Sequence, residues 1–145
     1  MLRRRTKVPL IVLEAFDGLG ALGGSIALVV SPTKLMGMQT AWLQGSPSCD
    51  YTVPAVVLLA GVGGSNLLAA GLLLKGRAQD GLLAAVAAGA ILVGFELVEL
   101  AVIGYQLFLQ PLTLATGLLT LVLALHAIRL NRRVGMYQKQ FGQPR

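Results

Sequence analysis

The sequence predicts an all-α membrane protein, a bundle of four transmembrane helices with both termini on the cytoplasmic side. Three observations support this fold class. Of the 145 residues, 55% are hydrophobic and only 12% are charged, against about 25% charged residues in soluble domains. Four apolar stretches are each long enough to cross a bilayer, and almost all basic residues lie on one side of them. We expect a single membrane domain over residues 1–145.

The first predicted span covers residues 8–30 and follows a basic N-terminus. This start resembles a secretory signal, but the apolar stretch exceeds the usual length of about 7 to 15 residues and contains Glu14 and Asp17. We therefore expect a retained first helix. The other spans are predicted at residues 53–74, 81–103 and 111–128. As helices the four would be about 27 to 35 Å long, which matches a hydrocarbon core of about 30 Å.

The basic residues predict the orientation of these spans. Eleven of the 12 Lys and Arg residues lie before the first span, between the second and third, or after the fourth, and the exception is Lys34. By the positive-inside rule, both termini are then cytoplasmic, including a basic tail over residues 129–145. Because these basic residues flank apolar spans, the net charge of +6 is explained by topology, and we expect no nucleic-acid partner.

The first outer loop, residues 31–52, is long enough to contain its own structure. Ser31 suits an N-cap, Pro32 the first helical position and Gly45 the stop of a short amphipathic helix. The apolar face of this helix would consist of Leu35, Met38 and Trp42. We expect Trp42 to be an interfacial anchor at headgroup depth, and the alternative is an irregular loop with one interfacial Trp.

Acidic residues inside the predicted spans are the main candidate site. Glu14 and Asp17 in the first span are three residues apart, as are Glu96 and Glu99 in the third, so each pair lies on one helical face. Small residues share those faces, which predicts that the carboxylates point into the bundle. With Asn66 near the middle of the second span, they form what we call the polar ladder: Glu14, Asp17, Asn66, Glu96 and Glu99.

The polar ladder has no Lys or Arg within the spans to neutralise it. Burial and mutual repulsion favour protonated carboxyl groups, which can donate hydrogen bonds and relay protons. One interpretation is therefore a proton or cation path. The other is that the carboxyl groups, Asn66 and the threonine stripe Thr113, Thr116 and Thr120 hold the helices together.

Other residues with chemical potential are few. A single cysteine, Cys49, and a single histidine, His126, give no metal-ligand cluster, and no nucleophile, base and orienting group can be assembled. We therefore expect no catalytic residues, no metal, no cofactor and no enzyme. His126 is expected at the cytoplasmic interface. Three small-residue pairs, expected to pack the bundle internally and not to specify a dimer, are Gly20 with Gly24, Gly61 with Ser65, and Ala90 with Gly94.

Several short motifs occur around the loops: a Trp-Leu-x-Gly-Ser-Pro stretch at residues 42–47, then Asp50-Tyr51, Pro54, Gly104-Tyr105-Gln106 and Gln110-Pro111. In this layout the chain resembles small four-helix integral membrane proteins of bacteria whose activity is uncharacterised. The resemblance implies a multi-pass protein of the bacterial cytoplasmic (inner) membrane. It implies no activity.

Two function hypotheses follow from these observations. The first is a non-enzymatic accessory or assembly subunit, whose partners are the lipid bilayer and other membrane proteins or a second copy of the chain. The alternative is a small proton-coupled or cation transporter that uses the polar ladder. A cavity joining Asp17 to Glu96 would favour transport, whereas a dry, packed seam would favour the structural role.

Overall fold

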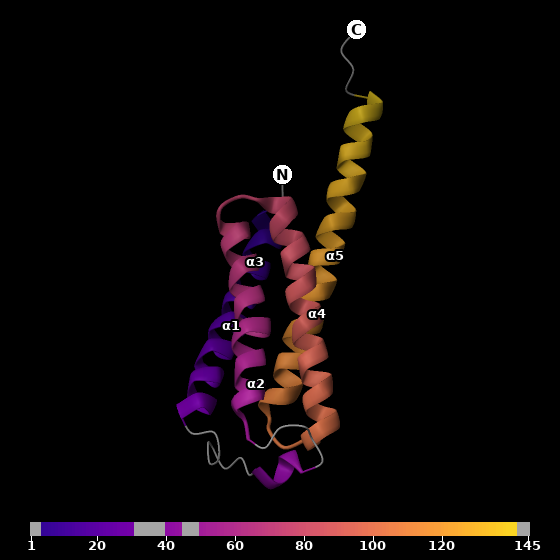
Figure 1. Cartoon of the computed structure of the whole chain (residues 1–145). Coiled ribbons are helices and arrows are strands. Elements are labelled where there is room, and N and C mark those ends of the chain that lie inside the picture. The colour runs from indigo at the N-terminus through magenta and orange to yellow at the C-terminus, as the bar shows by residue number, and fades with distance from the viewer. Residues whose placement is uncertain (1–3, 31–39, 45–49, 142–145) are drawn as a thin grey trace.

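A computed structural model describes residues 4–30, 40–44 and 50–141, which form four long helical segments packed side by side (Figure 1). The first segment is α1 (Arg4–Val30). The second is continuous from Thr52 to Leu74 and consists of α2 (Thr52–Val57), the π-helix η3 (Leu58–Gly63) and α3 (Gly64–Leu74). The third and fourth are α4 (Ala78–Ile103) and α5 (Leu109–Phe141).

All four segments are long and apolar enough to cross a membrane, so the prediction of an all-helical protein with four candidate membrane-spanning helices is confirmed for the described residues. Their outward faces are apolar. More than half of the surface of each of several large side chains is uncovered, among them Val12, Leu19, Leu68, Val98 and Val122. A continuous apolar exterior suits lipid and would be unusual on a monomeric soluble protein.

The two ends of the bundle differ, and we name them by what they contain. At the terminal end lie the start of α1 and the end of α5, as Figure 1 shows, and the turn between α3 and α4. At the loop end lie the described parts of the first loop and the turn between α4 and α5. The helix α4 packs between α3 and α5, and α1 completes the bundle by contacting α3, η3 and α5.

The turn at the terminal end is a tight helix stop. Gly76 takes a positive φ of 78°, the amide of Arg77 bonds the carbonyl of Leu72, and the amide of Gly76 bonds the carbonyl of Leu73. This is the Schellman arrangement, which a residue with a Cβ adopts only with strain. Arg77 also forms an ion pair with Asp80, at 2.7 Å, on the exposed first turn of α4. The turn therefore sets the antiparallel packing of α3 and α4.

Glycines let the helices approach closely at two crossings. A Cβ at Gly89 of α4 would lie 3.0 Å from the carbonyl oxygen of Gly117 in α5 and 2.9 Å from the Cγ of Leu121. A Cβ at Gly18 of α1 would lie 2.8 Å from the Cγ of Leu67 in α3. Small residues at such contacts are typical of membrane bundles, where close van der Waals packing drives helix association.

The core is continuous at the terminal end. Buried Leu and Ala side chains from all four segments fill it: Leu10, Ala69, Leu73, Leu82, Ala85, Ala88, Ala124 and Ala127. A separate cluster closes the loop end, where Leu43 and Tyr51 pack on Leu28, Ala55 and Ile103. Between these two clusters the interior contains the polar side chains described below.

The first loop is described only in part. Thr40–Leu43 form the single-turn 3₁₀ helix η2, and Leu43 is buried against the loop end of the bundle. Most of the expected amphipathic helix, including Leu35 and Met38, lies outside the described residues. Trp42 belongs to η2, and the placement of its side chain also lies outside what the structure describes.

The helices extend beyond several predicted limits. The span predicted at residues 111–128 begins at Leu109, and Pro111 falls in the first turn of α5, as expected. The helix then continues to Phe141, through most of the segment assigned to a basic tail. This extension has a simple cause, because residues 129–141 contain no proline and are rich in good helix formers.

Candidate functional site

The polar ladder lies inside the bundle. Glu14 and Asn66 are fully buried, Asp17 and Glu96 are 4% and 5% exposed, and Glu99 is half-buried. The helical spacing that placed each acidic pair on the same face as small residues therefore predicted the direction of these side chains correctly. The ladder brings together α1, α3 and α4, and threonines of α5 complete it.

The middle of the ladder is at the level where α1 and α5 meet. The hydroxyl of Thr116 donates a hydrogen bond to Oδ1 of Asp17 at 2.8 Å, linking helices that are 99 residues apart in the chain. The carbonyl oxygen of Thr113 lies 3.0 Å from the same hydroxyl and competes for its proton. One turn further along α5, Thr120 is fully buried. With Thr113, which lines the cavity described below, all three members of the predicted threonine stripe contribute to the site.

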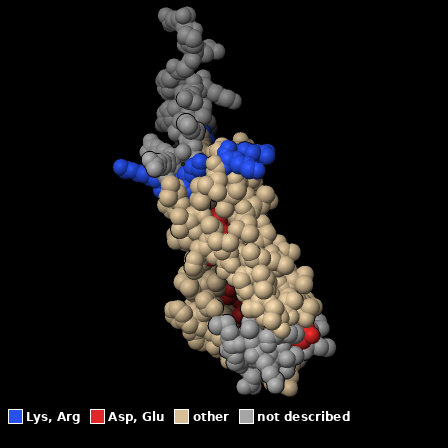
Figure 2. Space-filling model, turned by 90° about the vertical axis from the view of Figure 1, so that its left-hand side faces the viewer, with Lys and Arg blue, Asp and Glu red and all other residues tan. Residues whose placement is uncertain are grey.

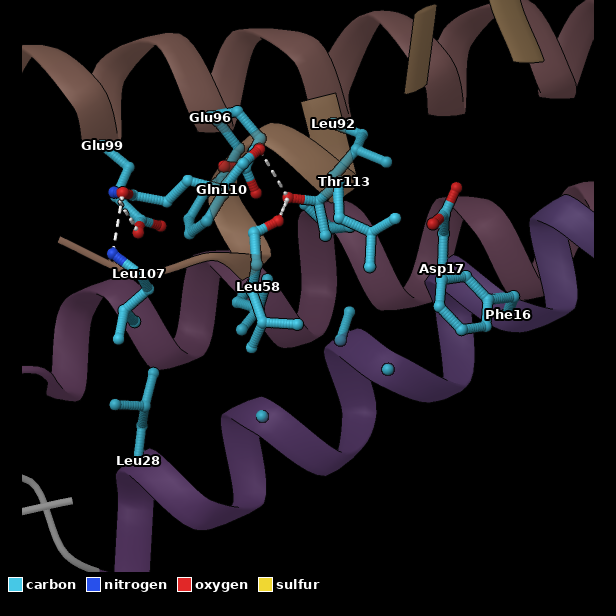
Figure 3. A pocket seen from close by; sticks show the side chains of 17 residues that line it. Phe16, Asp17, Leu28, Leu58, Leu92, Glu96, Glu99, Leu107, Gln110 and Thr113 are labelled. Carbon is cyan, nitrogen blue, oxygen red and sulfur yellow. Dashed lines mark hydrogen bonds between the residues drawn. The ribbon is translucent and has the colours of Figure 1, made fainter. Parts of the chain in front are cut away.

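Figure 3 shows a row of polar side chains leading from Asp17 to the loop end, through Thr113 and Glu96 to Glu99 and Gln110. The Thr113 hydroxyl of α5 lies 2.8 and 3.1 Å from the carbonyl oxygens of Leu109 and Gln110, and Thr113 lines the same cavity as Glu96. Nε2 of Gln110 donates to Oε1 of Glu99 at 3.0 Å. Beyond Asp17, the row is therefore shared by α4 and α5, the two helices that follow each other in the chain.

Gln110 organises the turn at the loop end. Its side chain is 2% exposed, and its Oε1 accepts hydrogen bonds from the amides of Gln106 and Leu107, at 2.9 and 3.2 Å. Its Nε2 also donates to the carbonyl oxygen of Gly104, at 3.1 Å. One buried amide thus satisfies the backbone of the turn and reaches Glu99 at the same time.

Tyr51 joins the site from the end of the first loop. Its side chain is 4% exposed and lies just outside the second span. Burial raises the pKa of Tyr51, and the nearby negative charge of Glu99 raises it further. The phenol therefore stays neutral over the physiological pH range, within the electrostatic reach of Glu99.

The second span contains a π-helix beside the ladder. Within η3 the backbone departs from α-helical hydrogen bonding, and side chains one turn later bond to its carbonyl oxygens. The Ser65 hydroxyl donates to the carbonyl of Gly61, and Nδ2 of Asn66 donates to that of Val62 at 2.8 Å. In a membrane such backbone groups must be satisfied within the protein. Part of the hydrogen-bonding capacity of Asn66 thus stabilises η3.

A cavity of about 220 Å³ lies between the two halves of the ladder. Its polar lining comes from Asp17, Glu96, Glu99, Gln110 and Thr113. Of the polar ladder, only Glu14 and Asn66 do not line the cavity. The remaining lining is apolar and includes Leu58 and Val62 of the second span. Asp17 and Glu96 are therefore joined by open space and not by a packed seam.

Several buried oxygens of the site have no hydrogen-bond partner among the residues that the structure describes. They are both carboxylate oxygens of Glu14, Oδ2 of Asp17, Oε2 of Glu96, Oδ1 of Asn66 and the Thr120 hydroxyl. Buried polar atoms are normally paired, and leaving one unpaired in a membrane costs several kcal/mol. The site is thus built to accept hydrogen-bond donors or positive charge from outside the chain.

The distribution of charge reinforces this property. Figure 2 shows Lys and Arg side chains gathered at the terminal end, and acidic side chains recessed in the face below them. Every Lys or Arg whose side chain is described lies at the terminal end: Arg5, Lys7, Lys75, Arg77, Arg129 and Arg132. The carboxylates of the ladder thus have no basic partner among the described side chains of the spans.

Other candidate residues lie apart from the site. His126 is exposed on α5 and does not face the buried Glu14. Tyr105, in the turn after α4, is 67% exposed. Cys49 lies outside the described residues. Within the described ranges, no three His, Cys, Asp or Glu side chains converge closely enough to hold a metal ion.

The small-residue pairs have different positions. Gly61 packs near Ile91 and Gly24 near Leu58, so these two contribute to internal packing as expected. Ala90 and Gly94 are instead exposed on α4, and a Cβ at Gly94 would meet nothing within 4 Å. For this pair the expectation of internal packing is wrong, because the buried face of α4 runs through Ala85, Gly89 and Leu92.

Comparison with known proteins gives no relative from which a role could be transferred. No protein-family model, no curated protein and no solved structure matches this chain. The function must therefore be argued from the geometry of the polar ladder and its cavity.

Proposed function

We propose that this protein moves protons, coupled to transport of a second solute, through the polar ladder. The observation that supports the proposal is the cavity that joins Asp17 to Glu96, together with their unpartnered carboxylate oxygens. Residues that serve only to bind helices together would use these oxygens in hydrogen bonds between helices. Glu14 departs furthest from that expectation, because neither of its carboxylate oxygens has a hydrogen-bond partner among the described residues.

Protons suit this arrangement better than a metal ion. The acids are spaced along the bundle, and among the described residues they do not converge as metal ligands do. Carboxyl groups separated by threonine hydroxyls, with room for water, can pass a proton from one to the next. About seven water molecules would fill the cavity, at about 30 Å³ each.

The two ends of the path are not equivalent. The cavity lies in the loop-end half, whereas the Leu and Ala core closes the terminal end beyond Glu14. A bundle with a cavity in one half and a packed core in the other is typical of one state of a transporter with alternating access. In this proposal, the π-helix η3 lines the cavity at Leu58 and Val62 and is a natural place for the second span to bend.

Proton flux in liposomes tests the proposal. Purified protein is reconstituted with a pH-sensitive dye inside, and a pH gradient or a potassium diffusion potential is imposed. We expect flux above that of protein-free liposomes, reduced at least tenfold in Asp17→Asn and Glu96→Gln. The matched control is Asp80→Asn, which removes an exposed carboxylate at the terminal end and should leave the flux unchanged.

Two results would refute the transport proposal. One is an absence of flux above protein-free liposomes over a range of pH values, under both kinds of driving force. The other is flux that persists unchanged in both ladder variants, which would place the path elsewhere.

The orientation belongs to the same proposal. The positive-inside rule supports a bacterial inner-membrane protein whose terminal end, with its basic residues, faces the cytoplasm. A cysteine at Lys75 should then resist an impermeant thiol reagent in intact cells, whereas Cys49 should react. Labelling of the cysteine at position 75 would instead indicate the opposite orientation. The short amphipathic helix in the first loop, anchored by Trp42, stays a prediction that quenching of Trp fluorescence by headgroup-labelled lipids can test.

An accessory or assembly subunit is the second candidate. The exposed pair Ala90 and Gly94 favours it, because small residues four apart on a lipid-facing surface let another helix approach closely. Purification in mild detergent should then recover a membrane-protein partner or a second copy, and Gly94→Leu should release it. Recovery of the isolated chain alone would count against this role.

A further inference from the structure

The mouth of the cavity is the feature that indicates a ligand. Four residues both line the cavity and are exposed on the outside of the bundle: Phe16, Gly20, Leu109 and Leu112. Two belong to α1 and two to α5. The cavity therefore opens between these two helices, on a surface that faces lipid.

Gly20 keeps this mouth open. A Cβ added there would meet nothing within 4 Å, although the residue lines the cavity. Gly24, one turn further along α1, also lines it. Because Gly20 lines the cavity, we expect a larger side chain there to narrow the opening without a clash at its Cβ, so this position would control access from the bilayer.

The floor and walls of the cavity define the chemistry of an occupant. On the floor are Asp17 and Glu96, each more than nine-tenths buried and each with an unpartnered carboxylate oxygen. The walls are apolar and include two aromatic rings, Phe16 and Phe95. Carboxylates together with aromatic faces favour an alkylated ammonium group, whereas a metal ion needs converging oxygen ligands.

The size of the cavity limits how much of such a molecule enters. At about 220 Å³ it is smaller than the roughly 300 Å³ at which pockets for drug-sized ligands begin. A cationic head with short substituents fits, but a long alkyl chain does not. The chain would leave through the mouth, where Leu109 and Leu112 present exposed apolar side chains.

We propose that the cavity binds an amphipathic ammonium ion that enters sideways from the bilayer, with its head between Asp17 and Glu96 and its chain between α1 and α5. This inference rests on the proposed function, since it names the solute that would exchange with protons. When the ammonium binds, a carboxyl O–H bond breaks and the proton passes to water, so charge is conserved. When a proton returns, the ammonium leaves.

Calorimetry on the full chain in lipid nanodiscs tests the site, with dodecyltrimethylammonium as the ligand. After subtraction of partitioning into empty discs, we expect saturable binding that is at least tenfold tighter than that of tetramethylammonium, which lacks the chain. Dodecanol, which lacks the charge, should not bind saturably. Repeating the titration in buffers of different ionisation enthalpy counts the protons released, and binding should tighten as the pH rises.

Three variants localise the binding. Glu96→Gln should weaken it about tenfold or more, since a charge-assisted contact is lost. Gly20→Leu should block the mouth and weaken binding by a similar factor. The matched control is Gly23→Leu, because Gly23 is also exposed with no atom within 4 Å of an added Cβ, but it does not line the cavity. It should bind as the unmodified chain does.

The outcomes separate this inference from the proposed function. Heats equal to those of empty discs, or equal losses in Gly20→Leu and Gly23→Leu, would overturn the ammonium site even if the liposomes conduct protons. Saturable binding that requires Glu96 but releases no proton, with no flux in liposomes, would retain the site and overturn the transport of protons.

Discussion

The close crossing of α4 and α5 at Gly89 offers the sharpest test of the packing. In Gly89→Ala, the new methyl would lie 3.0 Å from the carbonyl oxygen of Gly117 and 2.9 Å from the Cγ of Leu121. Ordinary contacts are 3.4 to 4 Å. A backbone oxygen and a side-chain branch point cannot simply rotate away, so the helices must separate by about 0.5 Å or more, and such overpacking costs about 1 to 3 kcal/mol.

A second alanine isolates this cost from helix propensity. Alanine stabilises a helix by about 1 kcal/mol relative to glycine, which would partly hide the effect of the clash. Gly94→Ala provides the same gain on the same helix, but its methyl meets nothing within 4 Å. The free energy of unfolding should therefore be about 1 to 3 kcal/mol lower for Gly89→Ala than for Gly94→Ala.

Unfolding in mixed micelles, followed by far-UV circular dichroism as the fraction of denaturing detergent rises, measures this difference. Gly117→Ala should fall between the two variants, because its methyl would meet only side-chain atoms of Leu92 and Val93, at 3.1 Å and beyond. If Gly89→Ala is as stable as Gly94→Ala, the helices do not cross as closely as the structure has them, and the shape of the neighbouring cavity is in doubt.

Three further predictions concern the polar site. Gln110→Leu should lower the free energy of unfolding by about 2 kcal/mol in the same assay, because turn amides and Glu99 lose a buried partner; an unchanged value would contradict this role. In a pH titration followed by absorbance at 295 nm, one tyrosine should ionise with a pKa above the ordinary value. This transition should be missing in Tyr51→Phe, and its pKa should be lower in Glu99→Gln. No such tyrosine would argue against burial of Tyr51. A double-mutant cycle of Asp17→Asn and Thr116→Val should give a coupling of about 0.6 to 1.7 kcal/mol, and strict additivity would deny their hydrogen bond.

Much of the fold could be predicted from the sequence because it depends on local patterns. The length of an apolar run sets a span, and three-residue spacing places Glu14 beside Asp17 and Glu96 beside Glu99 on faces shared with small residues. Those faces are buried in the structure. Such features need no knowledge of which helix lies beside which.

The composition of the site could not be predicted in the same way. Thr116 meets Asp17 across 99 residues, and Tyr51 approaches Glu99 from a loop, so both contacts depend on the register between distant segments. The cavity depends on that register too. The threonine stripe of α5 was a usable signal for Thr116, but nothing in the sequence around Tyr51 distinguished it from other loop residues.

The predicted helix limits were wrong where a helix continues beyond its apolar residues. The predicted fourth span stops at residue 128, where polar residues begin, but α5 remains helical to Phe141. Hydropathy reports the thickness of the hydrocarbon and not the end of the hydrogen-bonded backbone. The π-helix η3 has no hydropathy signature at all.

The π-helix changes what the number of residues in the second span means. Each residue of an α-helix turns the chain by about 100°. A π-helix closes i→i+5 hydrogen bonds, so each of its residues turns the chain by less, and the six residues Leu58–Gly63 turn it about as far as five α-helical residues would. If this segment became a regular α-helix without losing a residue, one side of the span would rotate by about 100° relative to the other. Leu58 could then no longer line the cavity while Asn66 faced the interior. A deletion of one residue within Leu58–Gly63 should therefore be better tolerated than a deletion elsewhere in the span, because the regular α-helix that forms keeps both faces in place.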